Sequence, residues 1–114
     1  MIAVIFEVYL DEDNKDEYLE LASELRGQLS EIDGFISIER FSSLVDEGKI
    51  LSLSFWRDEA AVEAWRNLES HRHAQERGRG GVFKNYRLRV AEVSRDYGMD
   101  SREQAPSDSQ KIHG

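Results

Sequence analysis

A short segment near the start of the chain constrains the fold more than any other feature. Residues 2–10 (IAVIFEVYL) are rich in β-branched and aromatic side chains, which favour an extended strand. Side chains alternate along a strand, so its residues divide between two faces. One face carries Ile2, Val4, Phe6, Val8 and Leu10, and the other carries Ala3, Ile5, Glu7 and Tyr9. Both faces are mostly apolar, so we expect this strand to be covered on both sides.

Two later segments show apolar residues at the spacing of an amphipathic helix. The first stripe comprises Tyr18, Leu21, Ala22, Leu25, Leu29 and Ile32, after the polar stretch 11–16 with its candidate capping carboxylates. The second stripe comprises Ala61, Ala64, Trp65 and Leu68. Asp58 can cap this second helix, and the periodicity fades near Ser70. We therefore expect a helix of about five turns ending at Asp33-Gly34, then a shorter helix, and over 71–81 a helical turn followed by a loop.

Three further segments have the composition of strands: 35–41, 49–56 and 83–94. The predicted order is β-α-β-β-α-β, which is that of a ferredoxin-like α+β domain with an antiparallel sheet and two helices on one face. Since two helices cover only one face, a second copy of the chain is expected to cover the other, as a homodimer. We expect the domain to span 1–98, and the polar residues 99–114 to be disordered or a peripheral arm.

Composition limits the classes of function. The 114 residues suit one domain, and the absence of cysteine excludes a disulfide framework and thiolate metal sites. No apolar run reaches the ~18 residues that span a bilayer, and the first residues lack a signal-peptide pattern, so we expect a cytoplasmic protein without a membrane partner. The net charge of −8 argues against a nucleic-acid partner.

The charge is unevenly distributed along the chain. Residues 1–34 hold ten acidic and two basic side chains, whereas 66–95 hold eight basic and three acidic ones. The surroundings of His71 and His73 are therefore locally positive. An anionic or phenolic ligand is compatible with this region despite the acidic total.

One stretch of sequence resembles a known family. The run Ser54-Phe55-Trp56-Arg57-Asp58-Glu59, then Ala64-Trp65 and His71 six residues beyond, is similar to the antibiotic biosynthesis monooxygenase (ABM) domain. The resemblance covers roughly residues 1–95. It implies a dimeric α+β barrel, in which two sheets face each other and each subunit holds a pocket between its helices and its sheet.

The resemblance implies a cofactor-independent monooxygenase acting on a small aromatic or quinol-like ligand. In that set of proteins a helix tryptophan and a polar residue six positions later line the pocket, which here implies Trp65 and His71 as catalytic residues. His71 would act as base, and Arg72, Arg87 or Arg89 would hold an anionic oxygen. The expected substrate-binding residues are Phe6, Phe35, Phe55, Arg72, His73 and Phe83.

Other interpretations of the same residues stay open. Heme-degrading relatives have an asparagine on the first strand, where this chain has Phe6 or Glu7. They also have an axial histidine ten residues after the tryptophan, where this chain has Gln75. His73 would have to replace that ligand, so no cofactor is expected, although heme is not excluded. Trp65 can equally be a core anchor, and the histidines can cap a helix end. A non-catalytic dimeric binding protein is the alternative function, and no metal site is expected.

Overall fold

The structure, a computed structural model, describes residues 1–77 and 84–108, with the backbone alone from 69 to 77. The predicted element order is confirmed. The strands are β1 (Ile2–Tyr9), β2 (Phe35–Ser42), β3 (Lys49–Trp56) and β4 (Asn85–Glu92). The helices are η1 (Glu12–Asn14), α1 (Lys15–Leu29) and α2 (Glu59–Arg77).

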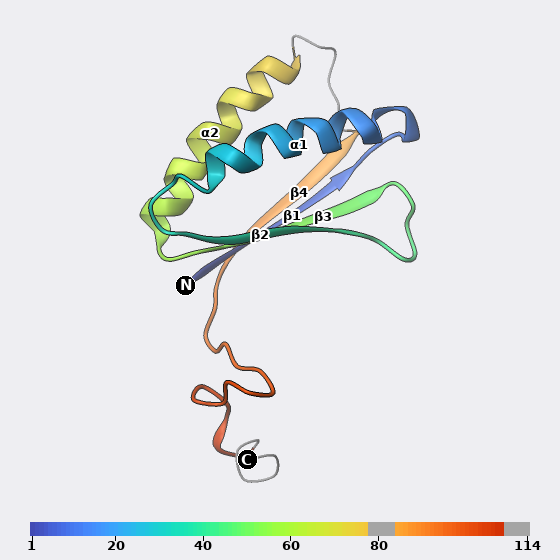
Figure 1. Ribbon diagram of the computed structural model, residues 1–114. Helices are drawn as coiled ribbons and strands as arrows, with labels where there is room; N and C mark the ends of the chain where they lie inside the picture. Colours follow the sequence, from blue (N-terminus) through green and yellow to red (C-terminus); the bar gives the residue numbers. More distant parts are fainter. Residues whose placement is uncertain (78–83, 109–114) are drawn as a thin grey trace.

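The four strands form one antiparallel sheet in the order β2-β3-β1-β4. Both helices lie on the same side of it (Figure 1). We call the helix-covered side the inner face and the other side the outer face. The inner face of β1 carries Ile2, Val4, Phe6 and Val8, all buried, as the alternation in the sequence predicts.

The core between helices and sheet consists of two apolar clusters. The first joins Ile2 and Val4 to Leu25 and Leu29 of α1, Ile38, Trp56, and Ala61, Val62 and Trp65 of α2. The second joins Phe6, Val8, Leu10, Tyr18 and Ile50. α1 therefore packs its first half on one cluster and its second half on the other.

The first helix is shorter than the sequence predicts. α1 ends at Leu29, and the single turn η1 occupies much of the expected cap region. Asn14, at the N-cap position, makes no side-chain cap hydrogen bond. The turn at Gly34 is present, and its φ of 94° is a left-handed conformation that glycine adopts at little cost.

The second helix is longer than predicted. α2 continues to Arg77, so the helical turn expected after residue 70 is present as part of α2, and the rest of the expected loop, from 78 to 81, lies outside the described residues. The Asp58 cap is confirmed, since the Ala61 N–H donates to Asp58 Oδ1 at 3.0 Å. That hydrogen bond, with the neighbouring Arg57, holds the pKa of Asp58 below its usual value. Arg57 also binds Asp33 at 3.1 Å and so joins the two helix–strand turns.

Gly34→Ala should destabilise the domain by about 2 kcal/mol or more, because the residue would occupy a left-handed conformation. Its Cβ would also lie 2.8 Å from the Ala61 Cβ. Urea unfolding followed by circular dichroism measures the change. Gly27→Ala is the control: it lies in α1 with no atom within 4 Å of the new Cβ, and should gain about 0.5–1 kcal/mol. Equal stability of Gly34→Ala and the parent chain would contradict this account of the turn.

Beyond Ser94 the described chain leaves the sheet as an arm (Figure 1). The arm has local structure, including hydrogen bonds from Gly98 N to Ser101 O and from Asp96 N to Gln104 Oε1, both 2.8 Å. The boundary at residue 98 stays a prediction. Within residues 1–77 and 84–108, no helix is long and apolar enough to cross a membrane.

Candidate functional site

A row of four inner-face residues crosses the middle of the sheet. The register places Arg40 of β2 beside Ser52 of β3, Ser52 beside Phe6 of β1, and Phe6 beside Leu88 of β4. From the β2 edge to the β4 edge, the row consists of Arg40, Ser52, Phe6 and Leu88. The row runs from a cation, through a small hydroxyl, to apolar side chains. It gives the helix-covered side a polar end and an apolar end.

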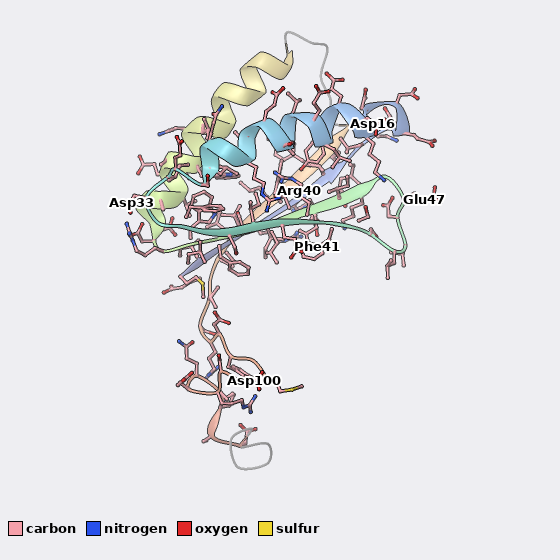
Figure 2. All side chains as sticks on the ribbon, viewed as in Figure 1. Asp16, Asp33, Arg40, Phe41, Glu47 and Asp100 are labelled. Atoms are coloured by element: carbon pink, nitrogen blue, oxygen red, sulfur yellow. The ribbon has the colours of Figure 1, made fainter. Side chains whose placement is uncertain are left out.

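The polar end lies within the domain. Arg40 is partly buried and its Nε has no hydrogen-bond partner within the described part of the chain. Figure 2 shows Arg40 between β2 and α1, while the adjacent Phe41 lies on the opposite side of the sheet. Ser52 is 5% exposed, so the neighbouring position is also shielded from solvent.

The apolar end is open. Tyr86, Leu88 and Val90 of β4 belong to the inner face by register, yet they are 53%, 39% and 44% exposed. Phe6 packs its ring edge against Tyr86 with centroids 5.6 Å apart. The inner face of β4 therefore offers an exposed apolar strip that can receive a flat, apolar molecule.

Trp65 lies beside this strip but inside the core. It is 6% exposed and belongs to the same cluster as Val4, whose register partner on β4 is Val90. Its ring centroid lies 6.3 Å from that of Trp56, and Trp56 in turn meets Phe35 at 5.3 Å. The core-anchor interpretation of Trp65 thus describes its packing, and a role at the edge of a site stays a prediction.

The histidine region is helical. Positions 71–73 fall within α2, and the structure describes their backbone alone. At 3.6 residues per turn, position 72 falls on the same side of the helix as 65 and 68, whereas position 71 falls on a different side. The helical register therefore favours Arg72 over His71 as a neighbour of the Trp65 stripe. Phe83 and His113 lie outside the described residues.

Three other predicted residues lie on the outer face. Phe55 pairs with Ala3 on that side, away from the inner-face Phe6 and Trp65. Arg87 and Arg89 also project to the outer face, opposite Glu7 and Ile5. Within one protomer, these residues do not share a site with Trp65. Phe6 and Phe35 do lie on the inner side, in separate clusters.

Glu7 on the outer face pairs with two cations. Glu7 Oε2 lies 3.4 Å from Arg89 Nη1, and Glu7 Oε1 lies 3.6 Å from Lys49 Nζ. Glu7 thus pairs with a basic residue on each of the two neighbouring strands, Arg89 of β4 and Lys49 of β3. Around these charges lie the apolar side chains of the outer face: Ala3, Ile5, Tyr9, Phe41, Leu51, Leu53 and Phe55.

A cleft of about 490 Å³ opens at one end of the sheet. Its lining includes the inner-face residues Ser42 and Ile50, one register row from Arg40 and Ser52. Asp11, Glu12 and Glu47 lie along it beside Lys15, so its charge is mainly negative. None of the predicted site residues lines it. Across residues 1–68 and 84–108, whose side chains the structure describes, no three His, Asp or Glu side chains gather as metal ligands.

Arg40 is an inner-face cation that the sequence analysis did not single out. The signal was present, because Arg40 follows Ile38 at strand spacing and so shares its face. The structure confirms that Ile38 is buried and that both residues lie on the inner face. The pairing of β2 with β3 is irregular between Phe35 and Ser37. The two-residue alternation of faces along β2 therefore does not extend to Phe35.

The fold defines a class: a small ferredoxin-like α+β domain with a four-stranded antiparallel sheet and two helices on one face. Residues 1–77 match the family model described as "Antibiotic biosynthesis monooxygenase". The chain belongs to the antibiotic biosynthesis monooxygenase family.

The similar proteins agree with this membership. The chain is 50% identical over 94 residues to the jasmonate monooxygenase ABM of Pyricularia oryzae, covering 82% of this chain and 44% of that protein. It therefore spans less than half of that relative's length. It is 31% identical to the uncharacterised protein YqjZ of Bacillus subtilis, over 82% of this chain and 79% of that protein.

Solved structures share the fold. A candidate antibiotic biosynthesis monooxygenase from Deinococcus radiodurans superposes with a TM-score of 0.73, covering 86% of this chain and 97% of that chain. The two sequences are 12% identical, so the likeness concerns the fold alone.

Proposed function

We propose that this chain is a monooxygenase acting on a small, largely apolar molecule of aromatic or quinol type, without flavin, metal or heme. The observation that carries the proposal is the exposed apolar strip of β4, which lies beside Phe6 and whose Val90 pairs with Val4 of the core cluster that holds Trp65. Membership of the family and the 50% identical relative, named as a monooxygenase, support the reaction class.

The proposed reaction needs dioxygen as its only co-substrate. For a substrate of the anthrone type, a base removes a proton from an activated CH2 group, and the carbanion reduces dioxygen to give a peroxide on that carbon. Loss of water then leaves a ketone, with one oxygen atom in the product and one in water. The substrate carbon supplies all four electrons, so the reaction balances without an external reductant.

The residues divide between three roles. His71 is the proposed base, because its ordinary pKa lies near working pH. A neighbouring guanidinium, Arg72 on the Trp65 side of α2, would stabilise the developing oxyanion. Trp65 and Phe6 would form apolar walls, which hold the flat substrate and exclude water. Helical register supports the role of Arg72, the inner-face placement of Phe6 supports its role as a wall, and the role of His71 rests on the family resemblance.

The proposed assembly is a homodimer that buries the outer face. Leu51, Leu53 and Phe55 are only partly buried there, and Phe41 is 43% exposed. A monomer would leave this apolar surface in water, whereas a second sheet would cover it. Three charged side chains of this face, Glu7, Lys49 and Arg89, already pair with one another within each copy.

Oxygen uptake with anthrone-type substrates, quinols and jasmonate tests the enzyme. We expect turnover by the parent chain, and a fall in kcat/KM of about 100-fold or more in His71→Ala because a general base is lost. Trp65→Phe should mainly raise KM. His113→Ala, in the polar tail, is the matched control and should behave as the parent. Unchanged activity in both site variants would refute these assignments.

The non-catalytic alternative gives a different result in the same assay. A binding protein would be stabilised thermally by one of these compounds without consuming oxygen. Hemin titration addresses the heme alternative: a Soret shift lost in His73→Ala would favour heme binding over the proposed chemistry.

A further inference from the structure

We propose that two copies of this chain pair through their outer faces about an axis parallel to the strands, so that Glu39 of each copy binds Arg89 of the other. This rests on the proposed homodimer, because it states how the two outer faces are oriented. The partner is thus a second copy whose β2 lies over β4. The charges at the two edges of the sheet distinguish this orientation from the opposite one.

One row of the outer face carries opposite charges at its two ends. The register places Glu39 of β2 beside Leu53 of β3. Leu53 lies beside Ile5 of β1, which lies beside Arg89 of β4. From the β2 edge to the β4 edge, the row is therefore acidic, apolar, apolar and basic. Both charged residues are exposed on edge strands of the sheet, where a second molecule can reach them.

Such a row is complementary to its own reverse. A two-fold dimer uses the same surface on both copies. With the axis parallel to the strands, each row faces the same row of the other copy, read from the opposite edge. Glu39 then faces the partner's Arg89, and Leu53 faces the partner's Ile5, at two equivalent places. Opposite charges meet at both edges, and apolar side chains meet in the middle.

Both charged groups have hydrogen-bonding capacity for this contact. Among the residues that the structure describes, Glu39 has no ion-pair partner. Arg89 Nη1 lies 3.4 Å from Glu7 Oε2, and a guanidinium has five N–H donors, so it can bind a second carboxylate. The adjoining row ends in Phe41 on β2 and in Arg87 on β4. The same axis places Arg87 over the partner's Phe41, where a guanidinium and an aromatic ring attract each other.

The opposite orientation brings like charges together. Two sheets with aligned strands can also pair about an axis perpendicular to the strands, which places β4 over the partner's β4. Arg87 and Arg89 of the two copies then face each other, and like charges in contact are unfavourable. Glu39 meets the partner's β2, whose outer-face residues are Ser37, Glu39 and Phe41. The charge pattern therefore favours the axis parallel to the strands.

Charge-reversal variants test the orientation. The dimer dissociation constant is measured by sedimentation velocity on the full chain at low salt, with circular dichroism to verify folding. We expect Glu39→Arg to raise this constant about tenfold or more, since it places a cation opposite the partner's Arg89. Arg89→Glu should raise it similarly. The double variant, which exchanges the two charges, should return to within about threefold of the parent.

Glu20→Arg is the matched control. Glu20 is exposed on α1, on the helical side of the domain, and its substitution changes the charge of the chain by the same amount. The chain carries a net charge of −8, so either substitution of a glutamate reduces the long-range repulsion between two copies. Net charge alone thus predicts a tighter dimer for both variants. Weaker pairing of Glu39→Arg reports the local contact with Arg89.

A distance measurement tests the orientation without changing these charges. The sequence contains no cysteine, so Ser94→Cys, at the start of the arm (Figure 1), gives one site per chain for a spin label. With strands about 4.8 Å apart and sheets about 10 Å apart, the proposed axis places the two labels about 20 Å apart. The perpendicular axis places them at opposite ends of the dimer, about 35 Å apart.

The outcomes separate this orientation from the dimer itself. A monomeric parent chain contradicts the proposed dimer and the orientation with it. A dimeric parent whose pairing is unchanged or tighter in Glu39→Arg and Arg89→Glu overturns the orientation alone, as does a label separation near 35 Å. Weaker pairing in both single variants that the double variant does not restore also overturns it. Oxygen uptake judges the proposed oxygenase separately, since none of these positions belongs to its site.

Discussion

Leu53→Glu should convert the proposed dimer into a monomer. Leu53 lies on the outer face between Ile5 of β1 and Glu39 of β2. A new carboxylate there would be buried without a partner, in each of the two copies, and would lie beside Glu39. We expect the dimer dissociation constant to rise by about 100-fold or more, equivalent to about 3 kcal/mol.

Sedimentation velocity measures the change, with circular dichroism to verify that the protomer is folded. Leu19→Glu is the matched control: Leu19 is 40% exposed on α1, on the helical side of the domain, and its substitution should leave the dimer intact. A Leu53→Glu protein that stays dimeric, or a parent chain that is already monomeric, would argue against burial of the outer face.

Trp56→Ala should cost about 3–5 kcal/mol of folding stability. Trp56 is fully buried, and its ring contacts Phe35 and Trp65. Its Nε1 also donates to the buried Ser54 Oγ at 2.9 Å. Removal would leave a large cavity below α2 and an unpaired hydroxyl. For a domain with a typical stability of about 5–15 kcal/mol, this loss is severe.

Urea unfolding compares this variant with two others. Ser54→Ala should cost less, about 1–3 kcal/mol, because it leaves only the indole N–H of Trp56 without a hydrogen-bond partner. Leu44→Ala should change nothing measurable, since Leu44 is fully exposed in the β2–β3 turn. If Trp56→Ala lost no more stability than Ser54→Ala, Trp56 would not be the centre of this core.

Much of the site was accessible from the sequence, and the failures have identifiable causes. Phe6 and the β4 strip follow from strand alternation, which is local. The faces of Phe55, Arg87 and Arg89 depend on register between strands far apart in the chain. A one-residue change of register exchanges the two faces, so no local pattern settles them.

The sequence by itself determined the order of elements, the Asp58 cap and the two apolar faces of β1. These features arise from side-chain period and capping chemistry within a few residues. Only the tertiary structure decided that α2 continues to Arg77 and that Trp56 lies at the centre of one cluster. It also decided that Arg40 lies between two clusters without a partner for its Nε among the described residues. The physical reason is that the burial of a side chain and its hydrogen-bond partners depend on which distant segments pack together across the sheet. The spacing of residues along the sequence does not determine that packing.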